Sequence, residues 1–596
     1  SAALVSRTGS LDWLCWPRFD SPAIFCGLLD PERGGFFSVR PLAIARVTRA
    51  YVGDSAVLRT VFHTEDGEFV LTDAMPIASP RHAKTTLSPE HEIVRMITCT
   101  RGQGDVEVRF EPRPGFAQWN DKLRDRGKLG IRIDTRQGLL TLRSDLPLVL
   151  TADKKGACGQ RCLRAGESIH LSLTWTADAP AVLPPLGNWT RDVIERTLRV
   201  WHEWSSRTRY TGRYSKEVIR SVIVVRLLSF APSGAIVAAA TTSLPEKRGG
   251  ENNWDYRYCW LRDAAFTVRG LLELGHPEEA LGFTNWLLHA TRLTQPRLLV
   301  LYDVFGRDPP PERSLPNLAG YQNAAPVRTG NGADEQVQLD AYGEVIDAVW
   351  RITRAGHRLD DTAARAVEGF GCFVCLNWCD ADAGIWEPRG DQQQHTHSLA
   401  LCWTALDRLI ELQECGDVRP LYRRLFTETR DEIRHEIESR GFNHALQSYT
   451  STLDGDQLDA TALLLGWYGV VDPGSARMRS TYRALCAVLS PQPGLLFRNK
   501  EAGDDGAFGI CCFWLAEHLA RGGGSLQEAR AAFEATLAFG NDLGIFAELI
   551  EPVTGAALGN VPQTFTHVGL INAALSLAER ERAEKAQTEP AAELLS

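Results

Sequence analysis

The chain has 596 residues, which is too long for one ordinary hydrophobic core, so we expect two or more domains. Its 65 basic and 74 acidic residues give a net charge of −9, and the basic residues are scattered without a long Lys/Arg block. This pattern gives no indication of nucleic acid or an anionic membrane as a partner.

The cysteines and the lack of targeting signals favour a cytoplasmic protein. The sequence has no hydrophobic span of 18 residues and no signal peptide. Cys372, Cys375 and Cys379 lie in an apolar helical run, and Cys511 and Cys512 are adjacent, which favours reduced, buried thiols over disulfides or a zinc site. We expect no metal and no cofactor. The abrupt opening of the chain leaves open whether a short N-terminal segment was removed.

Short segments of alternating polar and apolar residues fill the chain up to about Trp175. Such alternation, bounded by Gly, Pro or Asp, predicts β-strands. Their spacing predicts an antiparallel β-sandwich over residues 1–178, followed by a linker with a helical segment over residues 179–214. The predicted strands are 56–63, 69–73, 92–100, 106–111, 139–144 and 168–175.

From Ser215 onward the apolar residues recur with the period of helices. Twelve helices with alternately short and long connections predict an (α/α)6 barrel over residues 215–582, followed by a C-terminal tail over residues 583–596. The predicted helices are 215–230, 259–274, 277–291, 334–355, 360–378, 394–414, 418–438, 456–467, 475–489, 506–521, 525–539 and 564–580. We expect the active centre where the long loops meet. These loops are 239–258, 299–332, 380–393, 441–455, 491–505 and 541–563.

Two glutamates lie in segments that suit glycoside hydrolysis. Glu387 follows Trp386 in GIWEPRG, and Glu548 follows Ile545-Phe546-Ala547 in GIFAELIEPVTG. This reaction needs one carboxyl that partial desolvation keeps protonated and another that stays ionised to activate water. Ile385 and Trp386 can shield Glu387 from water, which favours its protonated form.

Four motifs in order along the chain carry a family resemblance. They are ENNWDYRYCWLRDA at 251–264, PVRTGNGADEQVQLDAYGEV at 326–345, GIWEPRG at 384–390 and GNVPQTFTHVGLINAAL at 559–575. With them the chain resembles the glucoamylase-type inverting hydrolases of glycoside hydrolase family fifteen, over nearly its whole length. The opening, GSLDWLCWPRFDSPAIFCGLLD at 9–30, resembles the trehalase-like N-terminal β domain of bacterial members.

The resemblance implies a role for each main carboxylate. Glu387, in the WE motif, corresponds to the catalytic acid, and Glu548 corresponds to the catalytic base. For an inverting enzyme we expect the two carboxyl groups roughly 6.5 to 9.5 Å apart, whereas about 5 Å would indicate a retaining nucleophile.

The resemblance also implies substrate contacts. The WLRD stretch, which binds the nonreducing terminal glucose in the family, corresponds to Trp260, Arg262 and Asp263, and an Arg-Asp pair suits hydroxyls that both donate and accept. Beside these we expect further substrate-binding residues at Trp254, Tyr256, Trp386, Arg328 and Arg498. For Trp254 and Tyr256, stacking on a sugar and burial in the core both remain open.

Three histidines have alternative roles. His395 and His397 could join Asp391 as metal ligands, but the corresponding stretch opens a helix in the family, so we favour hydrogen-bonding roles. His567 is expected behind the site in the same way.

Several positions depart from the family pattern. Leu549 stands where Glu or Gln often follows the base, Leu399 replaces a common lysine, and the segments 471–474 and 505–508 are altered. These changes leave both main carboxylates in place. They put the side that holds the leaving group in doubt, because an apolar residue beside the base can reshape that site.

The expected function is that of an exo-acting, inverting α-glucoside hydrolase that releases β-glucose from the nonreducing end of trehalose or short α-glucosides. Alternatives are a glucoamylase or glucodextranase acting on α-1,4 or α-1,6 glucans, a noncatalytic carbohydrate-binding protein, and an isoprenoid cyclase. The last would use Asp360-Asp361 and Asp380-x-Asp382 to hold Mg²⁺. The expected partner is an α-glucoside, with no nucleic acid and no membrane, and homo-oligomer formation stays open.

Overall fold

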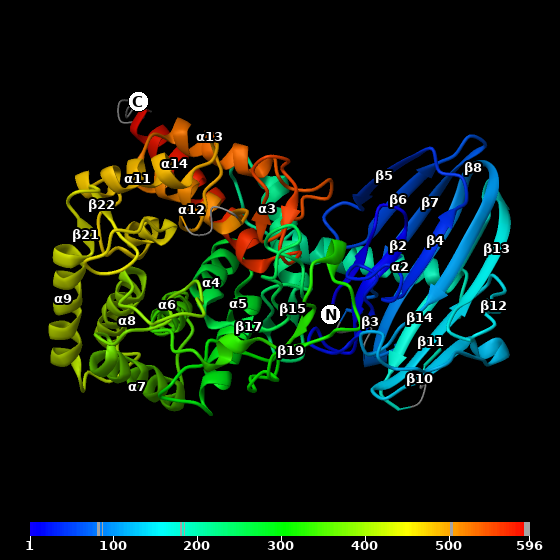
Figure 1. The fold of residues 1–596 in the computed structure, drawn as a ribbon, viewed down its shortest axis with the longest axis horizontal. Coiled ribbons are helices and arrows are strands. Elements are labelled where there is room, and N and C mark those ends of the chain that lie inside the picture. Colours follow the sequence, from blue (N-terminus) through cyan, green and yellow to red (C-terminus); the bar gives the residue numbers. More distant parts are fainter. Residues whose placement is uncertain (80–83, 86, 179–181, 184, 501–504, 589–596) are drawn as a thin grey trace, which may run out of the picture. The chain divides into compact units, whose positions relative to one another are not determined.

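The computed structural model describes residues 1–79, 84–85, 87–178, 182–183, 185–500 and 505–588 (Figure 1). The chain divides into two compact units. The first comprises Ser1–Arg207 and Ser314–Val327, and the second comprises Thr208–Arg313 and Arg328–Ser596.

The first unit is an antiparallel β-sandwich, drawn in blue to cyan (Figure 1). Its strands are β1 (Ala3–Val5), β2 (Ser10–Cys15), β3 (Ala23–Phe25), β4 (Phe36–Pro41), β5 (Arg46–Tyr51), β6 (Leu58–His63), β7 (Gly67–Ala74), β8 (His91–Glu111), β9 (Arg124–Asp125), β10 (Ile131–Thr135), β11 (Gly138–Ser144), β12 (Val149–Leu150), β13 (Ala157–Arg164) and β14 (Ser168–Thr176). The buried side chains of these strands form one continuous apolar core.

Strand β8 belongs to both layers of the sandwich. Its first half pairs with β7 and β14, and its second half pairs with β4 and β13. At the change of layer Gly102 has a φ of 71°, and a Cβ there would lie 1.8 Å from the backbone oxygen of Asp66, so only glycine fits. The predicted strands 92–100 and 106–111 were wrong as separate elements, because they are the two halves of β8.

Two further segments complete the first unit. Helix α2 (Asn188–Ser205) buries Val193 and Ile194 against strand residues, so the unit extends past residue 178. In the segment Ser314–Val327, Asn317 donates to the backbone oxygen of Phe116 at 2.8 Å, and the backbone of Ala319 donates to Asp30 at 3.0 Å. The predicted barrel loop 299–332 included this segment, which the structure places in the first unit.

The second unit, drawn in green to red in Figure 1, is a double ring of helices. Six helices each pack on the next and close the inner ring: α4 (Ala264–Glu273), α6 (Asp340–Arg354), α8 (Thr396–Glu414), α10 (Leu464–Tyr468), α12 (Gly509–His518) and α14 (Thr564–Thr588). Around them pack α3 (Ser215–Leu227), α5 (Pro277–Thr291), α7 (Asp361–Asn377), α9 (Arg423–Arg440), α11 (Ala476–Leu489) and α13 (Leu526–Leu537). The predicted fold class, a β-sandwich followed by an (α/α)6 barrel, is confirmed.

Several inner helices are shorter than predicted. The segment before α4 forms strand β17 (Cys259–Trp260), α6 begins only at Asp340, and α12 ends in a π-helical turn at Leu519–Gly523. The predicted helix 456–467 contains only a 3-10 turn and the short α10. The remaining short strands are β15 (Ser229–Phe230), β16 (Ala235–Ile236), β18 (Leu301–Tyr302), β19 (Arg313–Ser314), β20 (Arg328–Thr329), β21 (Phe442–Asn443), β22 (Ser448–Tyr449), β23 (Ala507–Phe508), β24 (Leu549–Ile550) and β25 (Ala557–Leu558).

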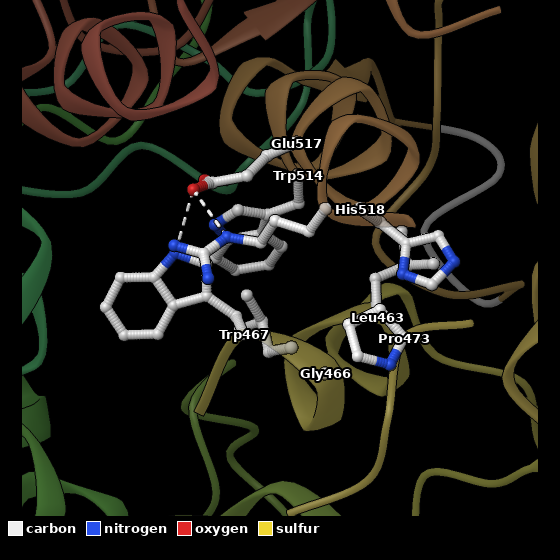
Figure 2. A pocket seen from close by; sticks show the side chains of 9 residues that line it. Leu463, Gly466, Trp467, Pro473, Trp514, Glu517 and His518 are labelled. Carbon is white, nitrogen blue, oxygen red and sulfur yellow. Dashed lines mark hydrogen bonds and ion pairs between the residues drawn. The ribbon is translucent and has the colours of Figure 1, made fainter. Parts of the chain in front are cut away.

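Glu517 joins four inner helices toward the C-terminal ends of α10 and α12, and Figure 2 shows its carboxylate beside Trp467 of α10. Its Oε1 accepts hydrogen bonds from Arg269 of α4 at 2.5 Å, from Trp467 of α10 at 3.0 Å and from Ser576 of α14 at 2.9 Å. Arg521, just after α12, adds a fourth at 3.2 Å. The cavity beside it, about 10 Å³, has room for about one water molecule, so this end of the barrel is filled.

None of the fourteen cysteines, all of which lie in the described ranges, forms a disulfide. Within the described ranges, every helix is too short or too polar to cross a membrane.

Candidate active site

A cavity of about 300 Å³ opens among loops that precede the inner helices. It is lined by five of the predicted site residues: Trp254, Tyr256, Trp386, Glu387 and Arg498. They come from the predicted long loops 239–258, 380–393 and 491–505. The structure therefore brings together residues more than 200 positions apart in the sequence, around a wall that mixes aromatic and charged groups.

Glu387 is held from one side. Trp260 Nε1 donates to Glu387 Oε1 at 2.7 Å, and Arg262 Nη1 donates to the same oxygen at 2.9 Å. Oε2 therefore stays available to a proton or a ligand. The backbone of Glu387 has a φ of 56°, a left-handed conformation that is rare for residues other than glycine and that clusters at functional sites.

The WLRD residues lie behind Glu387 and do not line the cavity. Arg262 Nη1 also donates to the backbone oxygen of Ile385 at 2.7 Å, so it fixes the loop as well as the carboxylate. Burial raises the pKa of Asp263 to about 6, and the charge of Arg262 opposes that rise. Direct contact of Trp260, Arg262 and Asp263 with a sugar stays a prediction.

Glu548 is buried, with 1% of its surface exposed, and is not among the residues that line the cavity. Tyr256 does line it, and burial and next the charge of Glu548 raise the pKa of the Tyr256 hydroxyl, so this side chain connects Glu548 with the cavity. The Asn560 backbone donates to Glu548 Oε2 at 3.4 Å, whereas Oε1 has no hydrogen-bond partner among the described residues. Burial, and next the negative charge of Glu246, raise the pKa of Glu548 to about 8.

The backbone beside Glu548 leaves no spare room. Gly559 has a φ of 70°, and a Cβ there would lie 2.3 Å from Glu548 Oε2. A side chain at this position would push the carboxylate away, so the glycine is part of the site. Leu549, the departure next to Glu548, is buried in β24 and does not line the cavity.

The other predicted substrate residues divide into two groups. Trp386 lines the cavity and donates from Nε1 to Asp459 at 2.8 Å. Arg328 does not line it; its guanidinium lies 4.6 Å from the ring centre of Trp254 and donates to the backbone oxygen of Glu251 at 2.7 Å. Burial lowers the pKa of Arg328. This arginine therefore supports the wall from behind.

Eight residues of the wall were not predicted: Glu246, Asn252, Asn331, Gly332, Ala333, Gln336, Pro388 and Arg389. Glu246 and Asn252 lie in the long loop that was expected to reach the site, and Arg389 follows Glu387 by two positions in its motif. Gln336 donates to the backbone oxygens of Glu387 and Pro388 at 3.4 and 3.3 Å. Only its place in the DEQVQLD motif could have indicated it.

Of the three histidines, His567 has the hydrogen-bonding surroundings expected of it, whereas both ring nitrogens of His397 and Nε2 of His395 have no hydrogen-bond partner among the described residues. His567 accepts from the backbone of Phe546 at 3.1 Å, and its other ring nitrogen contacts Ser221 at 3.0 Å, so it steadies the segment that leads to Glu548. Burial lowers the pKa of His567 to about 3. His397 is buried, with Nδ1 3.6 Å from Asp340.

The described residues contain no group of three Asp, Glu, His or Cys side chains arranged to hold a metal ion. Asp360 accepts hydrogen bonds from the backbone of Thr362 and Ala363 and so caps α7. Asp382 accepts from the backbone of Leu339 and from Ser398. Asp360 and Asp382, two of the four aspartates that raised the alternative of a cyclase, thus have structural partners.

Comparison with known proteins places this geometry in a family. A family model described as glycosyl hydrolases family 15 matches residues 212–575, and a model described as trehalase-like, N-terminal, matches residues 1–153. The chain is 32% identical to a trehalase of Mycolicibacterium smegmatis over 98% of its own length and 90% of that protein. It is 29% identical to a trehalase of Thermoplasma acidophilum over 97% and 98% of the two chains.

A solved structure of a bacterial glucoamylase complexed with acarbose is similar in fold, with a TM-score of 0.71 and 11% sequence identity. The likeness covers 96% of this chain and 91% of that one, and at this identity it concerns the fold alone. The resemblance stated from the motifs is confirmed by the family match. The chain belongs to glycosyl hydrolase family 15 and is a glycoside hydrolase.

Proposed function

We propose that this enzyme hydrolyses trehalose with inversion, using Glu387 as general acid and Glu548 as general base. The observation that supports this best is Tyr256, which lines the cavity beside Glu387 and on which the charges of both Glu548 and Glu387 act. A cavity of about 300 Å³ lies at the small end of ligand pockets and suits a disaccharide better than a long glucan. The relatives that match over nearly the whole chain are trehalases.

In the first role, Glu387 gives its proton to the glycosidic oxygen. Because Trp260 and Arg262 both donate to Oε1, the proton belongs on Oε2. When the proton leaves, the same two donors stabilise the carboxylate that remains. The leaving glucose thus departs as a neutral alcohol.

In the second role, Glu548 accepts a proton from water. Its unpartnered Oε1 is the atom that could accept it, and the activated water would attack the anomeric carbon from the face opposite the leaving group. The product from this sugar is β-glucose. The expected carboxyl separation of roughly 6.5 to 9.5 Å stays a prediction of this mechanism.

The wall of the cavity offers both kinds of sugar contact. Trp386 and Trp254 provide apolar surface, and Arg498 and Asn252 provide groups that donate to or accept from hydroxyls. We assign Arg262 and Asp263 to the hydroxyls of the terminal glucose, as in the family pattern. A cytoplasmic location and a homo-oligomer stay predictions.

The test follows the anomers that form from trehalose, observed by proton NMR before mutarotation. Inversion gives α-glucose and β-glucose in equal amounts, because the leaving glucose keeps its α configuration. Retention gives α-glucose alone and would disprove the mechanism. Maltose, isomaltose, dextran and starch are assayed beside trehalose, and faster hydrolysis of any of these would move the substrate to the glucoamylase or glucodextranase alternative.

A further inference from the structure

Glu246 is a buried carboxylate that the mechanism above does not use. Its side chain is 3% exposed, and it lines the cavity that holds Glu387. A buried charge needs partners, and a buried carboxylate beside two reacting carboxylates changes their electrostatics. Glu246 thus requires an explanation.

Glu246 holds two other residues of the cavity wall. Its Oε2 lies 3.1 Å from Arg498 Nη2. Burial raises the pKa of Glu246, and the charge of Arg498 and the neighbouring Trp254 side chain oppose that rise. The same Arg498 nitrogen lies 3.3 Å from Asp505. Arg498 and Trp254 were both predicted to contact substrate, so one carboxylate fixes two predicted binding residues.

The loop of Glu246 is also joined to the segment of Glu548. The Gly559 backbone donates to the oxygen of Pro245 at 2.8 Å, and Gly559 lies against the Glu548 carboxylate. Asn560 donates from its backbone to Glu548 and from its side chain to the backbone oxygen of Trp254 at 2.9 Å. These bonds link the loop of Glu246 to the segment of Glu548.

Among the described residues, three charged or titratable groups act most strongly on Glu548: Glu246 from the loop before Trp254, Tyr256 from the same loop and Arg498 from the loop before β23. The charge of Glu387 acts on Tyr256, and that of Asp505 acts on Arg498. Arg498 already has Glu246 and Asp505 as close partners, so Glu548 must share its positive charge with two other carboxylates.

Resting on the function proposed above, we propose that Glu246 is a positioning residue that holds Arg498 and Trp254 in the cavity wall and controls, through its charge, when Glu548 binds its proton. Two like charges in one desolvated corner titrate as a pair, because ionising one makes ionising the other harder. Glu246 touches the reaction only through these neighbours. It therefore affects the pH range of catalysis more than the chemistry itself.

The first experiment measures kcat/KM for trehalose against pH for the wild type and for Glu246→Gln. Without the charge at position 246, the midpoint that belongs to Glu548 should move to lower pH by about one unit, a tenfold change in proton affinity. Glu246→Asp keeps the charge and should keep the wild-type midpoint, with a higher KM because a shorter side chain reaches Arg498 poorly. A midpoint that does not move in Glu246→Gln overturns the proposal.

Glu251→Gln is the matched control. It removes one carboxylate from the same loop, but Glu251 is exposed and is not among the groups that act on Glu548. Its pH profile should coincide with that of the wild type. If Glu251→Gln shifts the midpoint as much as Glu246→Gln does, the effect is general electrostatics of the loop and the specific role of Glu246 is disproved.

A second experiment does not depend on activity. Thermal unfolding midpoints are measured at pH 9 for the wild type, Glu246→Gln, Glu548→Gln and the double variant. Repulsion between the two carboxylates predicts that the gain from either substitution becomes smaller when the other is present. Additive gains would disprove the coupling. If trehalose is not hydrolysed at all, the proposed function fails while this measurement still decides the inference.

Discussion

Two buried carboxylates of the barrel differ in their neighbours more than in their burial. Glu517 is 2% exposed and Glu548 is 1% exposed, and each has one oxygen without a hydrogen-bond partner in the described part of the chain. Yet the charges of Arg269 and Arg521 hold the pKa of Glu517 below its ordinary value, although burial opposes them. Burial and the charge of Glu246 raise the pKa of Glu548.

The contrast shows what separates a carboxylate that holds the fold from one suited to chemistry. Both groups have the same kind of desolvation cost, but two arginines offset it for Glu517, whereas Glu548 shares one arginine with two other acids. A carboxylate that can take up and release a proton near neutral pH is one whose charge is poorly compensated. The same logic makes Glu548 the better candidate for proton transfer.

The largest expected effect comes from replacing each carboxylate by its amide. Glu548→Gln should lower the rate of glucose release by about 10²- to 10⁴-fold, because the amide cannot accept a proton from water. Glu387→Gln should lower it by a similar factor. Glu517→Gln, which lies outside the cavity, should change the rate per folded molecule little. A comparable loss of rate in folded Glu517→Gln would break the distinction between the two sites.

The next effect concerns stability. Glu517→Ala leaves Arg269 buried without its closest partner and should lower the free energy of unfolding by about 3 to 5 kcal/mol, as measured in urea. The control is Glu273→Ala, which removes the other partner of Arg269 at 2.9 Å. Because Glu273 is 34% exposed, this change should cost under about 1 kcal/mol. Equal losses would mean that burial does not set the value of these pairs.

The pH dependence of the rate distinguishes the two possible roles of Glu548. With a pKa of about 8 in the unliganded structure, Glu548 is protonated at neutral pH, whereas a general base must be ionised. We therefore expect kcat/KM for trehalose to rise as the pH increases toward 8. A kcat/KM that falls as the pH increases toward 8 would contradict the role of Glu548 as general base.

The fold could be predicted largely from periodicity, and the errors of that prediction have physical causes. Helix α5 (Pro277–Thr291) begins and ends at the predicted residues, because proline at its first position marks the start. Strands before residue 56 were not predicted. Strand β2 (Ser10–Cys15), for example, is buried on both faces toward its end, so its apolar residues do not alternate. Residues 259–260 and 507–508 pair as strands where the helical pattern continued.

The site could be predicted only where a motif names the residue. Glu387, Glu548, Trp254 and Arg498 lie in recognisable segments, and the structure gathers them or connects them through Tyr256. Glu246 lies in no pattern that singles out its chemistry. Its ion pair with Arg498 spans 252 positions, and such a contact exists only once the loops have closed on one another.

The smallest effect, and the one that bears on both carboxylates at once, is the pH dependence of stability. For Glu548, whose pKa is raised on folding, the neutral form stabilises the protein; this contribution is complete below the unfolded-state pKa and is lost as pH rises through about 8. For Glu517, whose pKa is lowered on folding, the contribution is present above the unfolded-state pKa and is lost as pH falls through the folded-state pKa. Glu548→Gln should therefore remove part of the loss of stability as pH rises from about 4.5 to about 8, at roughly 1.4 kcal/mol for every tenfold difference in proton affinity between the folded and unfolded states. Glu517→Gln should leave that loss unchanged and should reduce the loss of stability at acid pH instead.

Unfolding midpoints measured from pH 3 to 9 for both variants test this. If the loss of stability toward pH 8 persists in Glu548→Gln, the charge of Glu548 is better compensated in the wild type than its neighbours in the structure suggest.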